Sequence, residues 1–150
     1  MQKLSRALAR AEERLRAHGL TGAQAFELLI RAMRRRLGDA LEVPEFAVEA
    51  VADLEFDGEV DLLGLAYERF FADLFKGRRG QYFTPRPLIE LLLHRAGVGP
   101  TDTVLDPTCG SGGFLVCSAR MGAKVRGIEL DPLLCSLAQL NLRLAGHHAD

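Results

Sequence analysis

Three short motifs guide the interpretation of this sequence: GQYFTP at residues 80–85, DPTCGSGGF at 106–114 and GIELD at 127–131. The second motif follows an apolar segment, 103–106, which predicts a short buried β-strand, and its glycines open a helix expected over about 111–121. A second strand over 124–130 and a helix capped by Asp131, with Leu133, Leu137, Leu140 and Leu144 expected in one apolar stripe, complete the pattern. This strand–helix–strand–helix order is typical of the start of a parallel α/β sheet with right-handed crossovers.

The glycine-rich turn after the first strand is suited to a ligand. Gly110, Gly112 and Gly113 let a ligand approach the backbone where a helix N-terminus offers N–H groups. A dinucleotide fingerprint would need a glycine in place of Leu115, and the Gly-Lys-Ser/Thr of a P-loop is absent, so a pyrophosphate ligand is disfavoured. Glu129 lies 19 residues after Gly110, where an acid can accept both hydroxyls of a ribose. The motifs therefore predict a nucleoside site. The alternative is an ordinary glycine-containing turn that binds no ligand, with an acid that caps it.

Neighbouring residues fit the same kind of ligand. Asp106 ends the first strand, and ligands of open parallel sheets gather at the carboxyl ends of strands. Ile128, together with Leu130 or Pro132, could flank an adenine ring.

The N-terminal half is expected to be helical. Apolar spacing predicts helices over 3–17, 22–37 and 62–76, the last with an aromatic-rich stripe, and a short one near 45–54, with Thr21 and Asp61 as N-caps. A further helix is expected to run to about Arg95, with Thr84 as N-cap and Pro85 at the N1 position. Residues 1–36 carry nine Lys/Arg against three Glu, whereas 39–61 carry nine acids and no base. The two blocks could contact a polyanion or neutralise each other, and we slightly favour neutralisation. The triple arginine 34–36 is likewise better explained by the helix macrodipole than by DNA contact.

The composition, 48% apolar and 26% charged, is that of a soluble globular protein. No apolar run approaches the ~20 residues that span a bilayer, and the N-terminus does not read as a secretory signal. Three cysteines without a CxxC pair and four histidines without ligand spacing favour reduced thiols, no metal and a cytoplasmic location.

The ordered motifs GQYFTP, DPTCGSGGF and GIELDP, with DLLGLAYERFF upstream, strongly resemble adenine-N6 DNA methyltransferases, above all the modification subunits of type I restriction systems. The resemblance covers about Asp61 to Gly146. It implies a helical segment, 1–79, followed by the start of a Rossmann-like S-adenosylmethionine-dependent methyltransferase fold, 80–150, with an incomplete sheet. It also implies cofactor contacts from Gln81, Tyr82, Phe83, Thr84, Pro85, Arg86, Asp106, Gly110, Ser111, Gly112, Gly113 and Glu129.

Catalysis in this family also requires an Asn/Asp-Pro-Pro-aromatic tetrapeptide, which holds the flipped adenine. Here neither Asp106-Pro107 nor Asp131-Pro132 is followed by a second proline. We therefore expect an N-terminal, cofactor-binding portion of such an enzyme that is inactive by itself. Its expected partners are DNA, specificity or other subunits, or a polypeptide supplying the C-terminal half. The alternatives are a non-catalytic cofactor-binding or assembly module, a gene remnant, and a methyltransferase acting on protein or a small molecule.

Overall fold

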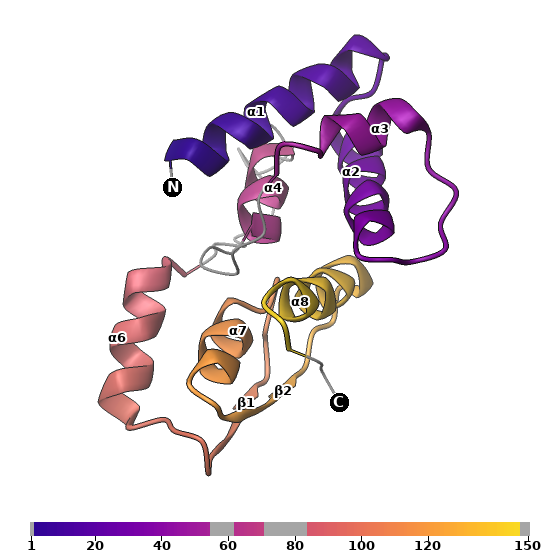
Figure 1. Ribbon diagram of the computed structural model, residues 1–150. Helices are drawn as coiled ribbons and strands as arrows, with labels where there is room; N and C mark the ends of the chain where they lie inside the picture. Colours follow the sequence, from indigo (N-terminus) through magenta and orange to yellow (C-terminus); the bar gives the residue numbers. More distant parts are fainter. Residues whose placement is uncertain (1, 55–61, 71–83, 148–150) are drawn as a thin grey trace. The chain divides into compact units, whose positions relative to one another are not determined.

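The computed structural model describes residues 2–54, 62–70 and 84–147, which belong to two compact units (Figure 1). The first unit contains helices α1 (Gln2–Ala17), α2 (Gly22–Arg36), α3 (Glu45–Ala50) and the part of α4 (Leu62–Phe70) that begins at Leu65. The second unit contains residues 62–64 and the elements α6 (Arg86–Ala96), β1 (Thr103–Asp106), α7 (Gly113–Arg120), β2 (Lys124–Gly127) and α8 (Pro132–Leu144). The boundary predicted at 79/80 lies outside the described residues.

The core of the first unit follows the predicted helical spacing. Leu8 and Leu15 of α1 are buried, as are Phe26, Leu29, Ile30 and Met33 of α2. The ring of Phe26 meets Tyr67 edge-on, with centroids 5.6 Å apart, and Phe70 at 5.9 Å. The aromatic stripe of α4 is therefore core as far as it is described, whereas Asp61 and residues 71–76 of the predicted helix lie outside the described residues.

Arginines of α2 fasten the acidic segment 39–54 to the helix. Arg34 bonds to the Asp39 carboxylate at 2.7 Å, Arg35 to the Val43 carbonyl at 2.9 Å, and Arg36 to the carbonyls of Val51 and Leu54. On α1, Arg10 and Arg14 pair with Asp53. The predicted neutralisation is thus seen in three ion pairs between the basic and acidic blocks, while residues 55–61 of the acidic block lie outside the described residues. Thr21 is the N-cap of α2, but its side chain makes no cap bond.

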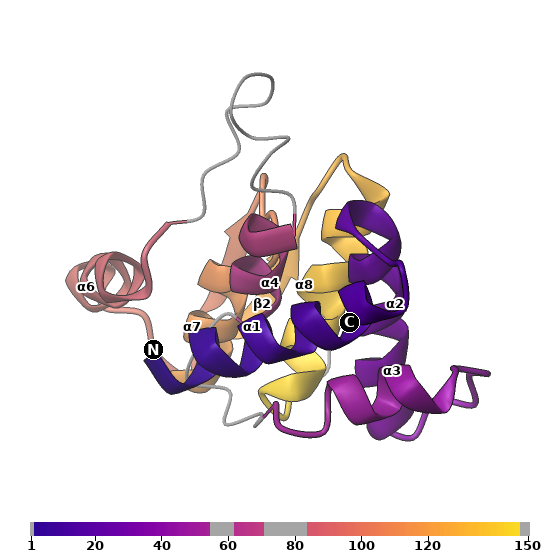
Figure 2. The same cartoon turned by 90° about the horizontal axis from the view of Figure 1, so that it is seen from above.

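The second unit is built on a parallel pair of strands, as predicted. Thr103 to Asp106 lie opposite Lys124 to Gly127, and α7 packs against both strands. In both views α7 lies between α6 and α8 (Figures 1 and 2). One apolar cluster joins α7 to α8 and the glycine turn through Cys109, Leu115, Ala119, Ala138 and Leu142. A second joins α6 to α7 through Ile89, Leu93 and Cys117.

The strands differ from the sequence expectation in burial and length. The side chain of Leu105 is 58% exposed, because α7 covers one face of the pair and successive strand residues point to opposite faces. The prediction of a buried first strand is therefore wrong, since its four residues are exposed or half-buried in alternation. The second strand ends at Gly127, three residues early, so that Glu129 follows the strand instead of ending it.

The start of α6 also differs from the prediction. α6 begins at Arg86 with Pro85 as N-cap, so Thr84 and Pro85 each stand one position earlier than predicted. The carbonyl of Pro85 accepts the N–H groups of Leu88 and Ile89, which closes the first turn without a side-chain cap. Asp131 does cap α8, accepting the Leu133 N–H at 2.9 Å. No helix in the described parts of the chain is long and apolar enough to cross a membrane.

Candidate cofactor-binding site

Hydrogen bonds continue between the two chain segments beyond the ends of β1 and β2. The Ile128 N–H donates to the Asp106 carbonyl, and the Cys109 N–H donates to the Ile128 carbonyl, both at 2.9 Å. The Asp106 carboxylate accepts the Thr108 N–H at 3.0 Å, which fixes the first residues of the turn. The glycine turn is therefore held beside residues 128 and 129, at the carboxyl ends of the strands.

Glu129 binds the glycine turn directly. Its Oε2 accepts the N–H of Gly110 at 2.9 Å, and its Oε1 accepts the N–H of Asp131 at 2.9 Å. A carboxylate offers about four lone-pair positions, so two backbone bonds leave further acceptor capacity on the same group. The structure thus brings together Gly110 and Glu129, both of which the sequence analysis named as site residues, through a bond that was not predicted.

The start of α7 presents backbone donors. Gly112 is the N-cap in the left-handed region, with φ of 88°, and its own N–H donates to the Cys109 carbonyl at 2.8 Å. Val116 is the first residue whose N–H bonds back into the helix, to the Gly112 carbonyl. The N–H groups of Gly113, Phe114 and Leu115 therefore have no carbonyl partner within the helix, and they lie at its positive end. The helix begins at Gly113, two residues later than predicted.

Exposed apolar side chains flank Glu129 in sequence. Ile128 is 58% exposed and Leu130 97% exposed, whereas Glu129 itself is half-buried. Exposed apolar side chains beside an acceptor carboxylate suit a nucleoside, in which an apolar-faced base adjoins a ribose diol.

The thiol of Cys109 lies under the turn. Burial, helped by the nearby carboxylates of Asp106 and Glu129, raises the pKa of the Cys109 thiol to about 11. This cysteine is therefore neutral at pH 7 and is not an activated nucleophile. Among the described residues, no group of three His, Cys, Asp or Glu side chains could hold a metal ion.

The remaining predicted site residues are less informative. Thr84 and Pro85 are exposed ahead of α6, and the Arg86 Nε bonds to the Glu90 carboxylate at 2.7 Å. Ser111 is buried, at 1% exposed. Gln81, Tyr82 and Phe83 lie outside the described residues.

The sequence analysis missed Asn141. This residue of α8 is 5% exposed, and its Nδ2 donates to the Ser111 carbonyl at 2.9 Å. The sequence feature that could have indicated its importance is an amide between Leu140 and Leu142 in a leucine-rich helix. The predicted apolar stripe 133, 137, 140 and 144 is also wrong at both ends, because Leu133 is 37% exposed and Leu144 only half-buried, while Leu134, Ala138 and Asn141 are buried.

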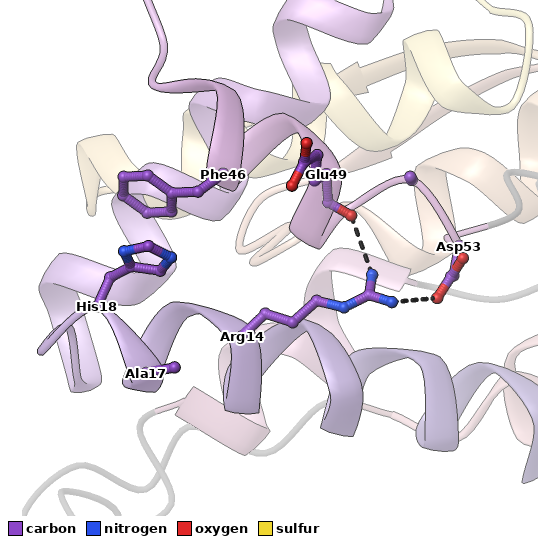
Figure 3. Close-up of a pocket in the computed structure, with 7 residues that line it drawn as sticks. Arg14, Ala17, His18, Phe46, Glu49 and Asp53 are labelled. Carbon is purple, nitrogen blue, oxygen red and sulfur yellow. Dashed lines mark hydrogen bonds and ion pairs between the residues drawn. The ribbon is translucent and has the colours of Figure 1, made fainter.

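A separate cavity of about 410 Å³ lies in the first unit, between α1 and α3 (Figure 3). The imidazole of His18 stacks on Phe46 with ring centroids 3.9 Å apart. Arg14 donates to the Glu49 carbonyl and to the Asp53 carboxylate across the cavity. These polar groups bond to one another where the two helices meet. They therefore give no indication of a ligand in this cavity.

The fold and the turn define a class: an α/β protein in which a glycine turn and an acid meet at the carboxyl ends of two parallel strands. Residues 58–150 match the model of a family described as N-6 DNA Methylase, and the chain belongs to that family. The family resemblance read from the three motifs is thereby confirmed.

Curated relatives and a solved structure agree with this assignment. The chain is 34% identical over 106 residues to the type I restriction enzyme HindI methylase subunit of Haemophilus influenzae, covering 62% of this chain and 24% of that protein. It is 31% identical over 116 residues to the StySPI methylase subunit of Salmonella potsdam, covering 70% and 22%. A crystal structure of a modification subunit assigned to a type I restriction enzyme from Vibrio vulnificus matches with a TM-score of 0.52 and 26% identity, covering 69% of this chain and 26% of that one. The chain spans about a quarter of the length of these relatives.

Proposed function

We propose that this chain binds S-adenosylmethionine and is the cofactor-binding portion of an adenine-N6 DNA methyltransferase of a type I restriction-modification system. The observation that carries the proposal is the position of Glu129, whose carboxylate is fixed against the glycine turn by the N–H of Gly110 and against α8 by the N–H of Asp131. An acid held from both sides is pre-organised to receive a ligand without rearranging.

The chemistry of the donor set fits this cofactor. The remaining lone pairs of Glu129 would accept the ribose hydroxyls, and Ile128 and Leu130 would cover the faces of the adenine. The N–H groups of Gly113 and Phe114 would donate to the carboxylate of the methionine end. When bound, the cofactor supplies an activated methyl group; the chain's own residues bind and orient it. By family resemblance, residues 81–86 would complete the methionine end.

Methyl transfer to adenine would need more than these residues. The flipped base must have its amine held by acceptors, and the sequence contains no Asn/Asp-Pro-Pro-aromatic tetrapeptide to supply them. The proposed partners are therefore DNA, specificity subunits and the part of the enzyme that carries this tetrapeptide. The proposed organisation is a helical segment, 1–79, and a methyltransferase portion, 80–150, acting in the cytoplasm.

Isothermal titration of the purified chain with S-adenosylmethionine tests the proposal. We expect saturable one-to-one binding that weakens about tenfold or more, equivalent to about 1.4 kcal/mol, in Glu129→Ala. Asp102→Ala is the matched control, because Asp102 also accepts a backbone N–H, that of Gly99 at 2.8 Å, in a turn before β1. Its affinity should stay within about twofold of the parent.

Equal binding by the parent and Glu129→Ala would contradict the assignment of the site. A folded parent chain that does not bind would instead favour an assembly module. That alternative rests on the exposed leucines of α6, since Leu88, Leu91 and Leu92 are each close to half exposed at 45%, 55% and 48%.

A further inference from the structure

The glycine turn also contacts α8. Gly112 stands so close to α8 that a Cβ added to it would lie 3.0 Å from both the Cα and the Cβ of Ala138. Three residues further along α8, the side-chain amide of Asn141 reaches the Ser111 carbonyl at 2.9 Å. Residues three apart share one face of a helix, so a single face of α8 contacts the turn at two points.

The Ser111–Gly112 peptide is consequently fixed at both ends. Its carbonyl accepts from Asn141, and its N–H donates to the Cys109 carbonyl at 2.8 Å. The next residue, Gly113, opens α7, so the orientation of this peptide sets the direction in which the first N–H groups of α7 point.

Asn141 is an unusual residue for its position. It is 5% exposed on a helix whose neighbouring buried residues are Leu137, Ala138, Leu140 and Leu142. Burying an amide among apolar side chains is unfavourable unless its hydrogen bonds are made. A buried asparagine at this position therefore requires a hydrogen-bond partner. The Ser111 carbonyl is that partner.

We propose that Asn141 is a positioning residue for the cofactor site: it fixes the Ser111–Gly112 peptide so that the N–H groups at the start of α7 are aligned for the ligand. This inference rests on the proposed function for the identity of the ligand. The effect on the turn does not, because the contact is present in the chain itself.

The test compares Asn141→Leu with Leu140→Ala in the full chain. Leucine branches at Cγ as asparagine does, although it is larger, and it removes the donor, whereas Leu140, 3% exposed, lies two residues from Ala138 and thus on the other side of α8. Titration with S-adenosylmethionine should show about a tenfold loss for Asn141→Leu and less than about threefold for Leu140→Ala. Thermal unfolding of both variants shows whether a loss of affinity merely follows a loss of stability.

Amide hydrogen exchange followed by NMR is a second readout that needs no ligand. In Asn141→Leu the Gly112 N–H should exchange about tenfold faster, while the Ile128 N–H, bonded to the Asp106 carbonyl, keeps its rate. Unchanged Gly112 exchange, or parent-like affinity in Asn141→Leu, overturns the inference. If the parent chain does not bind, the proposed function fails and takes the cofactor role of Asn141 with it, and the exchange result still decides whether Asn141 holds the turn.

Discussion

The two units of this chain cover their surfaces differently. In the first unit, helices bury their apolar faces against one another, and arginines of α2 bind the carbonyls of a connector that has little regular structure. In the second unit, apolar side chains remain on the surface. The exposed large apolar residues among the described parts of the chain all belong to it: Leu88, Leu91, Leu92, Leu105, Ile128, Leu130 and Leu133.

This difference separates two uses of the sequence. In the first unit, arginine side chains bind backbone carbonyls that have no partner in a helix or sheet. A structural module needs such partners for its backbone groups. The exposed side chains of the second unit cluster on α6, on one face of the strand pair and beside Glu129, where a ligand or a partner surface would cover them. The contrast is consistent with the proposed binding site, which lies in the second unit.

The largest expected loss of stability comes from a substitution at Gly127, beside the buried cluster of the second unit. A Cβ at Gly127 would lie 2.6 Å from Leu115 Cδ1 and 2.8 Å from Cys109 Sγ. Gly127→Ala should lower the free energy of unfolding by about 3 kcal/mol in urea denaturation, because the buried cluster must shift. Gly99→Ala is the control: its nearest neighbour would be 3.9 Å away, and we expect a change below about 0.5 kcal/mol. Similar effects of the two changes would show a loosely packed turn.

The next prediction concerns the arginines that bind backbone carbonyls in the first unit. Arg36→Ala removes the donor to the carbonyls of Val51 and Leu54 and should cost about 2 kcal/mol of unfolding free energy. Arg16→Ala breaks an exposed ion pair with Glu12 on α1 and should cost less than about 0.5 kcal/mol. Chemical denaturation followed by helical circular dichroism measures both. Equal costs would mean that the arginines of α2 act as ordinary surface charges.

The pH dependence of stability reports on Cys109. Its pKa in the folded chain is about 11, above the ordinary value of 9.0, so folding favours the protonated thiol. The associated stability is present below pH 9 and is lost as the pH rises toward 11. The parent should lose about 1–2 kcal/mol more than Cys109→Ala across that window, measured by urea denaturation at each pH. Parallel pH profiles for the two proteins would contradict the buried position of this thiol.

The smallest stability effect is expected on the open face of the strands. Leu105→Thr removes apolar surface that is already 58% exposed, so the free energy of unfolding should change by less than about 0.5 kcal/mol. If this face pairs with other copies of the chain, self-association measured by sedimentation should be weaker in the variant than in the parent. A stability loss near that of a core residue would show that Leu105 is covered within the chain, and would weaken the contrast between the units.

Much of the second unit could be predicted from local sequence. The order of elements, the parallel pairing of β1 with β2 and the cap at Asp131 all follow from spacing and residue type, because each depends on a short stretch or on the geometry of one β–α–β unit. The start of α6 was misplaced by one residue, since two prolines near a helix start permit either register.

The sequence by itself determined the family, the glycine turn and the acid that faces it. The tertiary structure decided which side chains of α8 are buried, that Leu105 lies on an open face, and that Asn141 holds the Ser111 carbonyl. The physical reason is the range of the interaction. Helical periodicity tells which residues share a face, but the direction of that face is chosen by packing, here by the close approach of Ala138 to Gly112, residues 26 positions apart in the chain.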